Sequence, residues 1–138
     1  MSAWKELIDA KRKSNLEKIP KEWRLPEDLL QKVDSNSNAN VLDIPTTCGI
    51  LTQKEIDITD APDATTLLQK LASGDLTAYE VTLAFCKRAA IAQQLLNCLT
   101  EIFFDQALER AKALDDHFTK HGKPMGSLHG LPISLKVL

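Results

Sequence analysis

The chain has 138 residues, the length of one ordinary domain, and its 17 basic and 19 acidic side chains leave a formal charge of −2. That balance excludes a protein whose main task is to cover phosphates, so we expect no nucleic-acid partner. Hydrophobic residues at 43% and charged residues at 26% are globular values, which exclude wholesale disorder. No apolar run approaches the roughly 20 residues of a membrane span, so we expect no integral membrane association.

The cysteines and the N-terminus indicate the compartment. Cys48, Cys86 and Cys98 are odd in number and lack CxxC spacing, which favours free thiols over a disulfide framework or a zinc ribbon. The first residues contain neither a long apolar region nor a cleavage site, so we expect no secretory signal. Together these features predict a cytoplasmic protein.

Residues 1–50 are predicted to form a helical extension. From Ala3 to Ile19, apolar residues recur at helical spacing among lysines, which favours a helix that packs across a larger body with its charged face in water; a lipid or partner surface is the alternative. Pro20 ends this helix, and Pro26 starts a short second one. Residues 34–40 are polar and turn-forming, which predicts a loop.

Three further helices are predicted from their ends. Asp63 caps a helix that Gly74 ends, the run Thr77–Glu80 is a capping box, and Asp105 caps a helix that Gly122 ends. Their inward faces are expected to carry Leu67, Leu68 and Leu71 in the first, Val81, Ala84, Phe85, Ala89, Ala92 and Leu96 in the second, and Ala107, Leu108, Ala111, Leu114 and Phe118 in the third.

Extended structure is expected at two places. Leu99–Phe103 and Ile133–Leu138 have the composition of short strands, whereas Ile50–Ile58 fits either a helical turn or an extended piece. A strand at the end of a chain with few other strands leaves its backbone groups unpaired, which predicts an interrupted domain.

Several residues are candidates for chemistry. His117 and His121 share a helix face, but a metal site needs a further ligand, and exposed histidines are the favoured interpretation. Ser127 lies near His129, yet the surrounding glycines do not fit a GxSxG elbow. Cys86 lies among apolar residues and is interpreted as a core residue. The residues alone would make Lys136 a solvated strand lysine.

A longer pattern changes the interpretation of Lys136. Residues 128–136 read LHGLPISLK and closely resemble the first catalytic motif of the amidase signature family. The upstream segments SGDLTAYEV (73–81) and NCLTE (97–101) resemble further parts of the family pattern, in the same order. The resemblance runs from about Thr52 to Lys136, and the N-terminal helices are similar in style to those of fungal acetamidase-like members.

The resemblance implies a fold and an activity. The fold would be α/β, with a mixed sheet wrapped by helices; this mostly helical chain would be its N-terminal part, and residues 51–138 an incomplete amidase signature domain. Family members hydrolyse C–N bonds of linear amides, which implies a small-molecule amide substrate, no cofactor and no metal. In the family a lysine acts as the base, through an intervening serine, on a nucleophilic serine that forms an acyl-enzyme. Lys136 occupies the position of that lysine.

The chain departs from the family pattern in three respects. Ser127 stands where the family usually has proline, and Val137 stands where it has aspartate. The Gly/Ser-rich segment that supplies both serines is not among these residues. Because an exposed lysine is protonated near neutral pH, a lysine base needs burial in a dry site. We therefore expect this polypeptide alone to be inactive; the alternative function is a truncated helical protein without catalysis or a partner-binding module.

Overall fold

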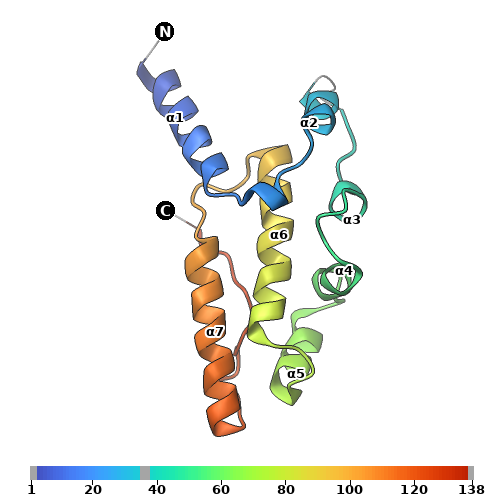
Figure 1. Cartoon of the computed structure of the whole chain (residues 1–138), viewed down its shortest axis with the longest axis vertical. Coiled ribbons are helices and arrows are strands. Elements are labelled where there is room, and N and C mark those ends of the chain that lie inside the picture. Colours follow the sequence, from blue (N-terminus) through green and yellow to red (C-terminus); the bar gives the residue numbers. More distant parts are fainter. Residues whose placement is uncertain (1–2, 35–37, 137–138) are drawn as a thin grey trace. The chain divides into compact units, whose positions relative to one another are not determined.

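The described part of the chain is helical, as the sequence predicts. The computed structural model describes residues 3–34 and 38–136, and within these ranges it contains no strand. The helices are α1 (Ala3–Glu17), the 3₁₀ helix η1 (Lys21–Trp23), α2 (Glu27–Asp34), α3 (Ile44–Thr47), α4 (Gln53–Thr59), α5 (Ala64–Ser73), α6 (Ala78–Leu96) and α7 (Phe104–His121) (Figure 1).

Both strand predictions are wrong for the residues that the structure describes. Leu99–Phe103 is a loop that leads into α7, and residues 133–136 form no regular element; Val137 and Leu138 lie outside the described residues. A strand exists only where its backbone pairs with that of a neighbour, and neither segment has such a neighbour in the described ranges. The ambiguous segment around residues 50–58 forms α4.

Contacts divide the chain into two units. Unit 1 comprises Met1–Ile50 and Ala89–Ile102, and unit 2 comprises Leu51–Arg88 and Phe103–Leu138, so that α6 contributes residues to both. Each unit buries apolar side chains of its own. The segment that resembles the amidase motif belongs to unit 2.

In unit 1, a glutamine side chain binds the segment after η1. The carboxamide oxygen of Gln94 accepts a hydrogen bond from the Leu25 N–H at 2.8 Å, and its nitrogen donates to the Trp23 carbonyl at 2.9 Å. Trp23 and Leu25 are thereby held with their side chains buried, together with Ile19 and Ile91. Of the predicted polar loop, Ser35, Asn36 and Ser37 lie outside the described residues.

The first half of α1 exposes its apolar side chains in the described part of the chain, so its packing across a larger body stays a prediction. Trp4 is 59% exposed and Leu7 72% exposed, so these side chains are not packed against unit 1. Polar groups attach the second half of α1 to the loop that follows α6: the Asn15 side chain donates to the Leu99 and Thr100 carbonyls, both at 3.3 Å. Lys11 and Lys18 also form ion pairs with Glu101.

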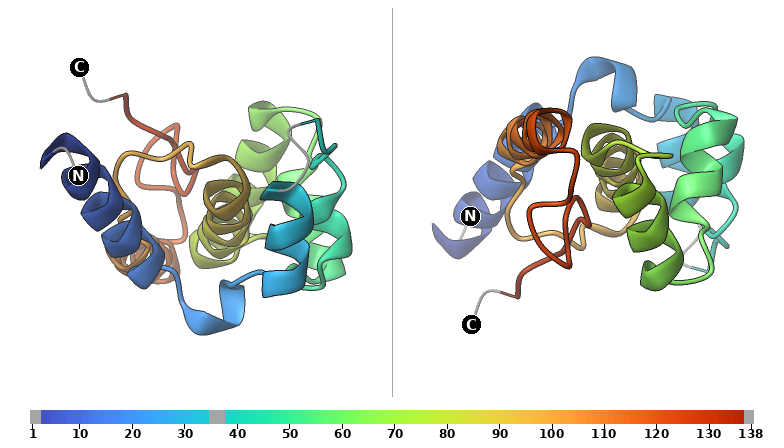
Figure 2. Two further views of the ribbon diagram at one scale, coloured as in Figure 1. Left: turned by 90° about the horizontal axis from the view of Figure 1, so that it is seen from above. Right: turned by 90° about the horizontal axis from the view of Figure 1, so that it is seen from below.

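Unit 2 has a core formed by four helices. α5, α7 and the N-terminal half of α6 lie side by side (Figure 2), and α4 adds one side chain to the buried cluster. The inward faces predicted for α5 and α7 are buried or half-buried, and so is the face predicted for α6 except at Leu96, which is 61% exposed. The prediction for α6 also omits Ile91, which is fully buried. The buried members of the cluster are Ile58, Leu67, Leu71, Ala78, Val81, Ala84 and Ala111.

Helix caps follow the sequence at most ends. Asp63 accepts a hydrogen bond from the Thr66 N–H at 2.7 Å, and Gly74 ends α5 in the left-handed conformation. The prediction for Asp105 is wrong: α7 begins after Phe103, which provides no side-chain cap, and Asp105 lies in the first turn. The first residue of the helix, Phe104, is buried.

The first turn of α6 receives acceptors from two places. Thr77 and Glu80 form the predicted capping box, with both reciprocal hydrogen bonds at 3.1 Å. From α7, the Asp115 carboxylate accepts from the Ala78 N–H at 2.7 Å and from the Tyr79 N–H at 2.9 Å. Three N–H groups that a helix leaves unpaired at its start are thus satisfied, and the negative charge lies at the positive end of the helix dipole.

Removal of this carboxylate should destabilise unit 2. Asp115→Ala leaves two backbone N–H groups without acceptors, and we expect the free energy of unfolding to fall by about 2 kcal/mol. Asp116→Ala is the matched control, because Asp116 is the exposed neighbour on the same helix and should change stability little. Urea unfolding followed by far-ultraviolet circular dichroism measures both, and equal stabilities of the two variants would contradict the assigned role.

Candidate functional site

The amidase-like motif follows α7 and has two parts with different surroundings. Gly122 ends α7 with φ +63°, and the chain turns back so that residues 125–131 contact α5, α6 and α7. Residues 133–136 are exposed instead, with Ile133 at 71% and Leu135 at 85%. We name residues 125–131 the docked half of the motif region and residues 132–136 its exposed half.

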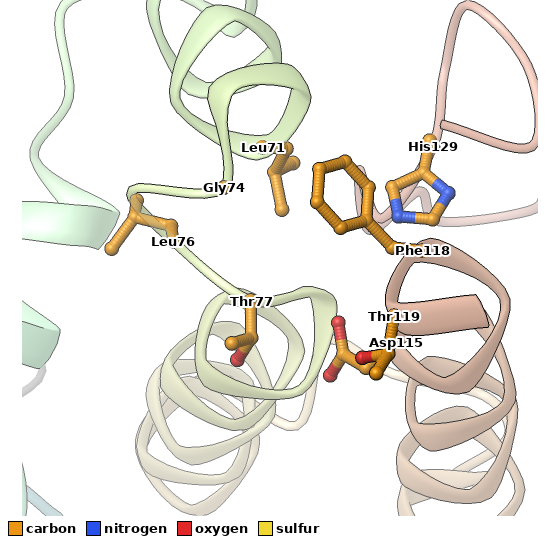
Figure 3. Close-up of a pocket in the computed structure, with 8 residues that line it drawn as sticks. All are labelled: Leu71, Gly74, Leu76, Thr77, Asp115, Phe118, Thr119 and His129. Atoms are coloured by element: carbon orange, nitrogen blue, oxygen red, sulfur yellow. The ribbon is translucent and has the colours of Figure 1, made fainter. Parts of the chain in front are cut away.

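His129 is the buried polar residue of the docked half. Its side chain is 6% exposed, and its ring centroid lies 5.8 Å from that of Phe118 on α7 (Figure 3). Nδ1 accepts a hydrogen bond from the Met125 N–H at 3.1 Å, and the His129 N–H donates to the Gly126 carbonyl, also at 3.1 Å. These two bonds close the loop of residues 125–129 on itself.

At Gly130 the backbone of the docked half packs closely against α5 and α6. Its φ is +75°, a left-handed value that favours glycine, and a Cβ there would lie 2.9 Å from both the Leu71 Cδ2 and the Ala78 Cβ atoms. It would also lie 3.2 Å from the Ala78 Cα, which belongs to the backbone of α6 and cannot rotate away. Leu131 follows and packs against the core cluster of unit 2.

A small cavity lies beside His129. Its volume is about 90 Å³, room for a few water molecules rather than for a substrate. Asp115 is its acidic residue, and both of its oxygens already accept backbone N–H groups. The cavity is lined by Leu71, Gly74, Leu76, Thr77, Asp115, Phe118, Thr119 and His129 (Figure 3).

Lys136 lies in the exposed half. Its side chain is exposed, and within the described ranges no hydrogen bond or ion pair engages it. The neighbouring Ser134 is exposed as well. The structure therefore places Lys136 on a segment whose surroundings are not formed by the residues described.

Ser127 and His129 do not form a nucleophile–base pair. Because Nδ1 of His129 accepts a backbone hydrogen bond, the neutral ring carries its proton on Nε2. Neither nitrogen is then free to take a proton from a hydroxyl group. Ser127 is exposed, whereas the imidazole is buried, and within the described ranges no hydrogen bond joins the two side chains.

The other candidates have ordinary surroundings. The rings of His117 and His121 are 4.4 Å apart, but among the residues that the structure describes no group of three or more His, Cys, Asp or Glu side chains could hold a metal ion. Burial, together with the charges of His121 and other neighbours, lowers the pKa of His117. Burial raises the pKa of the Cys86 thiol to about 11, so this cysteine is a core residue and a poor nucleophile at neutral pH.

Comparisons with known proteins decide the family. A family model described as Amidase matches residues 80–137, which include the motif region. An amidase from Gibberella moniliformis is 50% identical over 133 residues, which are 96% of this chain and 25% of that protein. The acetamidase of Emericella nidulans is 52% identical over 134 residues, which are 97% of this chain and 23% of that protein.

A solved structure agrees with the sequence relatives. A fatty acid amide hydrolase superimposes with a TM-score of 0.76 at 36% sequence identity, over 94% of this chain and 22% of that chain. The chain belongs to the amidase signature family. It spans about a quarter of the length of the curated amidases that it matches, and its helical structure corresponds to part of the family fold. None of the described helices of this family member is long and apolar enough to cross a membrane.

Three residues of this amidase-family chain were missed as structural determinants by sequence reasoning. Asp115 has no local signal, because the N–H groups that it caps belong to residues 36 and 37 positions earlier. The sequence offers His129 as a base beside Ser127, and only its burial and its Met125 partner show its structural role. The sequence shows that position 130 is a glycine, but it does not show that Ala78 lies against this glycine.

The two left-handed glycines around the motif differ in their surroundings, and their substitutions should differ accordingly. At Gly122 nothing lies within 4 Å of an added Cβ, so Gly122→Ala should lower the free energy of unfolding by about 1 kcal/mol through backbone strain. Gly130→Ala adds the contact with Ala78 and should lower it by about 2 kcal/mol more. Thermal or urea unfolding of both variants measures the difference; equal losses would show that the docked half is not closely packed.

Proposed function

We propose that this chain is the N-terminal part of an amidase that hydrolyses C–N bonds of linear amides. The observation that supports this proposal is the match of nearly the whole chain, at about half of its positions, to a fungal amidase and to an acetamidase. In this proposal residues 51–138 are the first part of the amidase domain, residues 1–50 are a helical extension, and the protein is cytoplasmic. The substrate is a small-molecule amide, and no cofactor takes part.

Lys136 is the proposed proton carrier of this reaction. Amide hydrolysis needs an activated hydroxyl group, a proton for the leaving amine, and donors for the oxyanion of the tetrahedral intermediate. In the Ser-Ser-Lys mechanism a neutral lysine takes the proton of the nucleophilic serine through the bridging serine and then returns it to the amine. Burial is what favours a neutral lysine, so the exposed Lys136 requires cover from the part of the domain that lies beyond these residues.

A second candidate function is a partner-binding helical module without catalysis. Exposed apolar side chains in the exposed half of the motif region, together with Trp4 and Leu7 on α1, favour this alternative. Activity measurements on the chain and on a completed domain distinguish the two candidates.

The polypeptide of 138 residues should show no amidase turnover. It lacks the serines of the proposed mechanism, and its Lys136 is open to water, so neither a nucleophile nor a base is available. Hydrolysis of simple aliphatic and aryl amides, measured by release of ammonia or arylamine, should equal that of buffer. Turnover that follows the chain through two different chromatographic columns would contradict this expectation and would make Ser127 a candidate nucleophile again.

A completed domain tests Lys136 directly. Residues 1–136 replace the corresponding part of the Emericella nidulans acetamidase, with the relative's own residues from position 137 onward. In the active chimera, Lys136→Ala and Lys136→Arg should each lower kcat by at least about a hundredfold, since arginine keeps the charge but does not release a proton.

The arginine variant is the decisive one. If Lys136 only pairs with a carboxylate, arginine should keep most of the activity, and a folded Lys136→Arg chimera with parental rates would refute the assignment. Ser127→Ala in the same chimera is the control, because Ser127 is exposed and lies outside the proposed mechanism.

A further inference from the structure

The docked half of the motif region fixes the start of the segment that carries Lys136. His129 closes residues 125–129 through the Met125 N–H, and its ring packs beside Phe118 of α7. Gly130 then places the backbone against α5 and α6, where an added Cβ finds no room. The loop is thus attached to three helices immediately before the exposed half begins.

The backbone conformation is also restricted where the docked half ends and the exposed half begins. The ring of Pro132 fixes its own φ, and a residue that precedes proline is confined to extended conformations, which applies to Leu131. Leu131 itself packs on the core cluster. Position and direction are therefore both set at Leu131–Pro132, and Lys136 follows within a few residues.

We propose that His129 is a positioning residue for Lys136, and that it acts through the hydrogen bond from Met125 to its Nδ1 atom. This inference rests on the proposed function, since it assigns a role toward the proposed base. The imidazole takes no part in proton transfer, because Nδ1 is engaged by a backbone N–H and the neutral ring therefore carries its proton on Nε2. What His129 supplies is a fixed starting point for residues 132–136, the segment that carries Lys136.

Two uncharged substitutions separate this role from a chemical one. The side-chain oxygen of Asn and the Nδ1 atom of His are the same number of bonds from Cβ. The oxygen in His129→Asn can therefore still accept the hydrogen bond from the Met125 N–H. In Gln the oxygen stands one bond further away, so His129→Gln cannot accept it in the same place. Neither side chain can serve as a proton carrier at neutral pH.

The experiment uses the active chimera described above and has two readouts. His129→Asn should keep kcat within about threefold of the parent, with an unchanged pH profile, whereas His129→Gln should lower kcat by roughly tenfold to a hundredfold with little change in KM, as a misplaced catalytic group does. Amide hydrogen exchange of a peptide covering residues 122–131 should match the parent in the Asn variant and be faster in the Gln variant.

The outcomes distinguish the failure of each proposal. Equal and severe loss of kcat in both folded variants would assign proton transfer to His129, and parental kcat in both would show that the hydrogen bond does not position Lys136; either result overturns the inference. If the Gln variant does not fold, the Asn variant decides, because fast exchange or a large loss of kcat in a folded His129→Asn chimera refutes the role. Retained activity in Lys136→Arg would refute the proposed base instead, whatever the His129 variants show.

Discussion

Three backbone N–H groups at the start of α6 determine how unit 2 holds together. Two of them donate to the Asp115 carboxylate on α7, and the third belongs to the capping box of Thr77 and Glu80. Because Ala78 begins α6 and also lies against Gly130, the same turn meets both α7 and the motif region. The docked half therefore depends on a helix start that is fixed by a residue of another helix.

Ion pairs attach α4 to the N-terminal half of α6. Lys87 donates to Glu55 at 2.6 Å, and Lys54 donates to Glu80 at 2.5 Å. Burial opposes ionisation of Glu55, but hydrogen bonds from Lys87 and Thr52 outweigh burial and lower the pKa of this carboxyl group. A carboxyl with a lowered pKa in the folded state adds stability above its unfolded pKa, and that contribution disappears as the pH falls through the folded value. These contacts should therefore weaken on acidification.

The sequence predicts local features well and non-local ones poorly. The cap at Asp63 and the capping box at Thr77 are visible because donor and acceptor lie three residues apart. The strands at Leu99–Phe103 and Ile133–Leu138 were wrong for the described residues because pairing, not composition, makes a strand. The site is predictable only as a motif, since the separate surroundings of His129 and Lys136 depend on contacts with distant helices.

The division of the motif region at Pro132 has a genetic consequence. Substitutions at His129 or Gly130 act on a packed loop, so their alleles should be temperature-sensitive and reduce the amount of folded protein. Substitutions at Ser134 or Lys136 act on exposed side chains, so the amount of folded protein should stay normal at every temperature. A single short sequence pattern would thus yield two classes of mutant, separated by whether a chaperone or a lower growth temperature restores them.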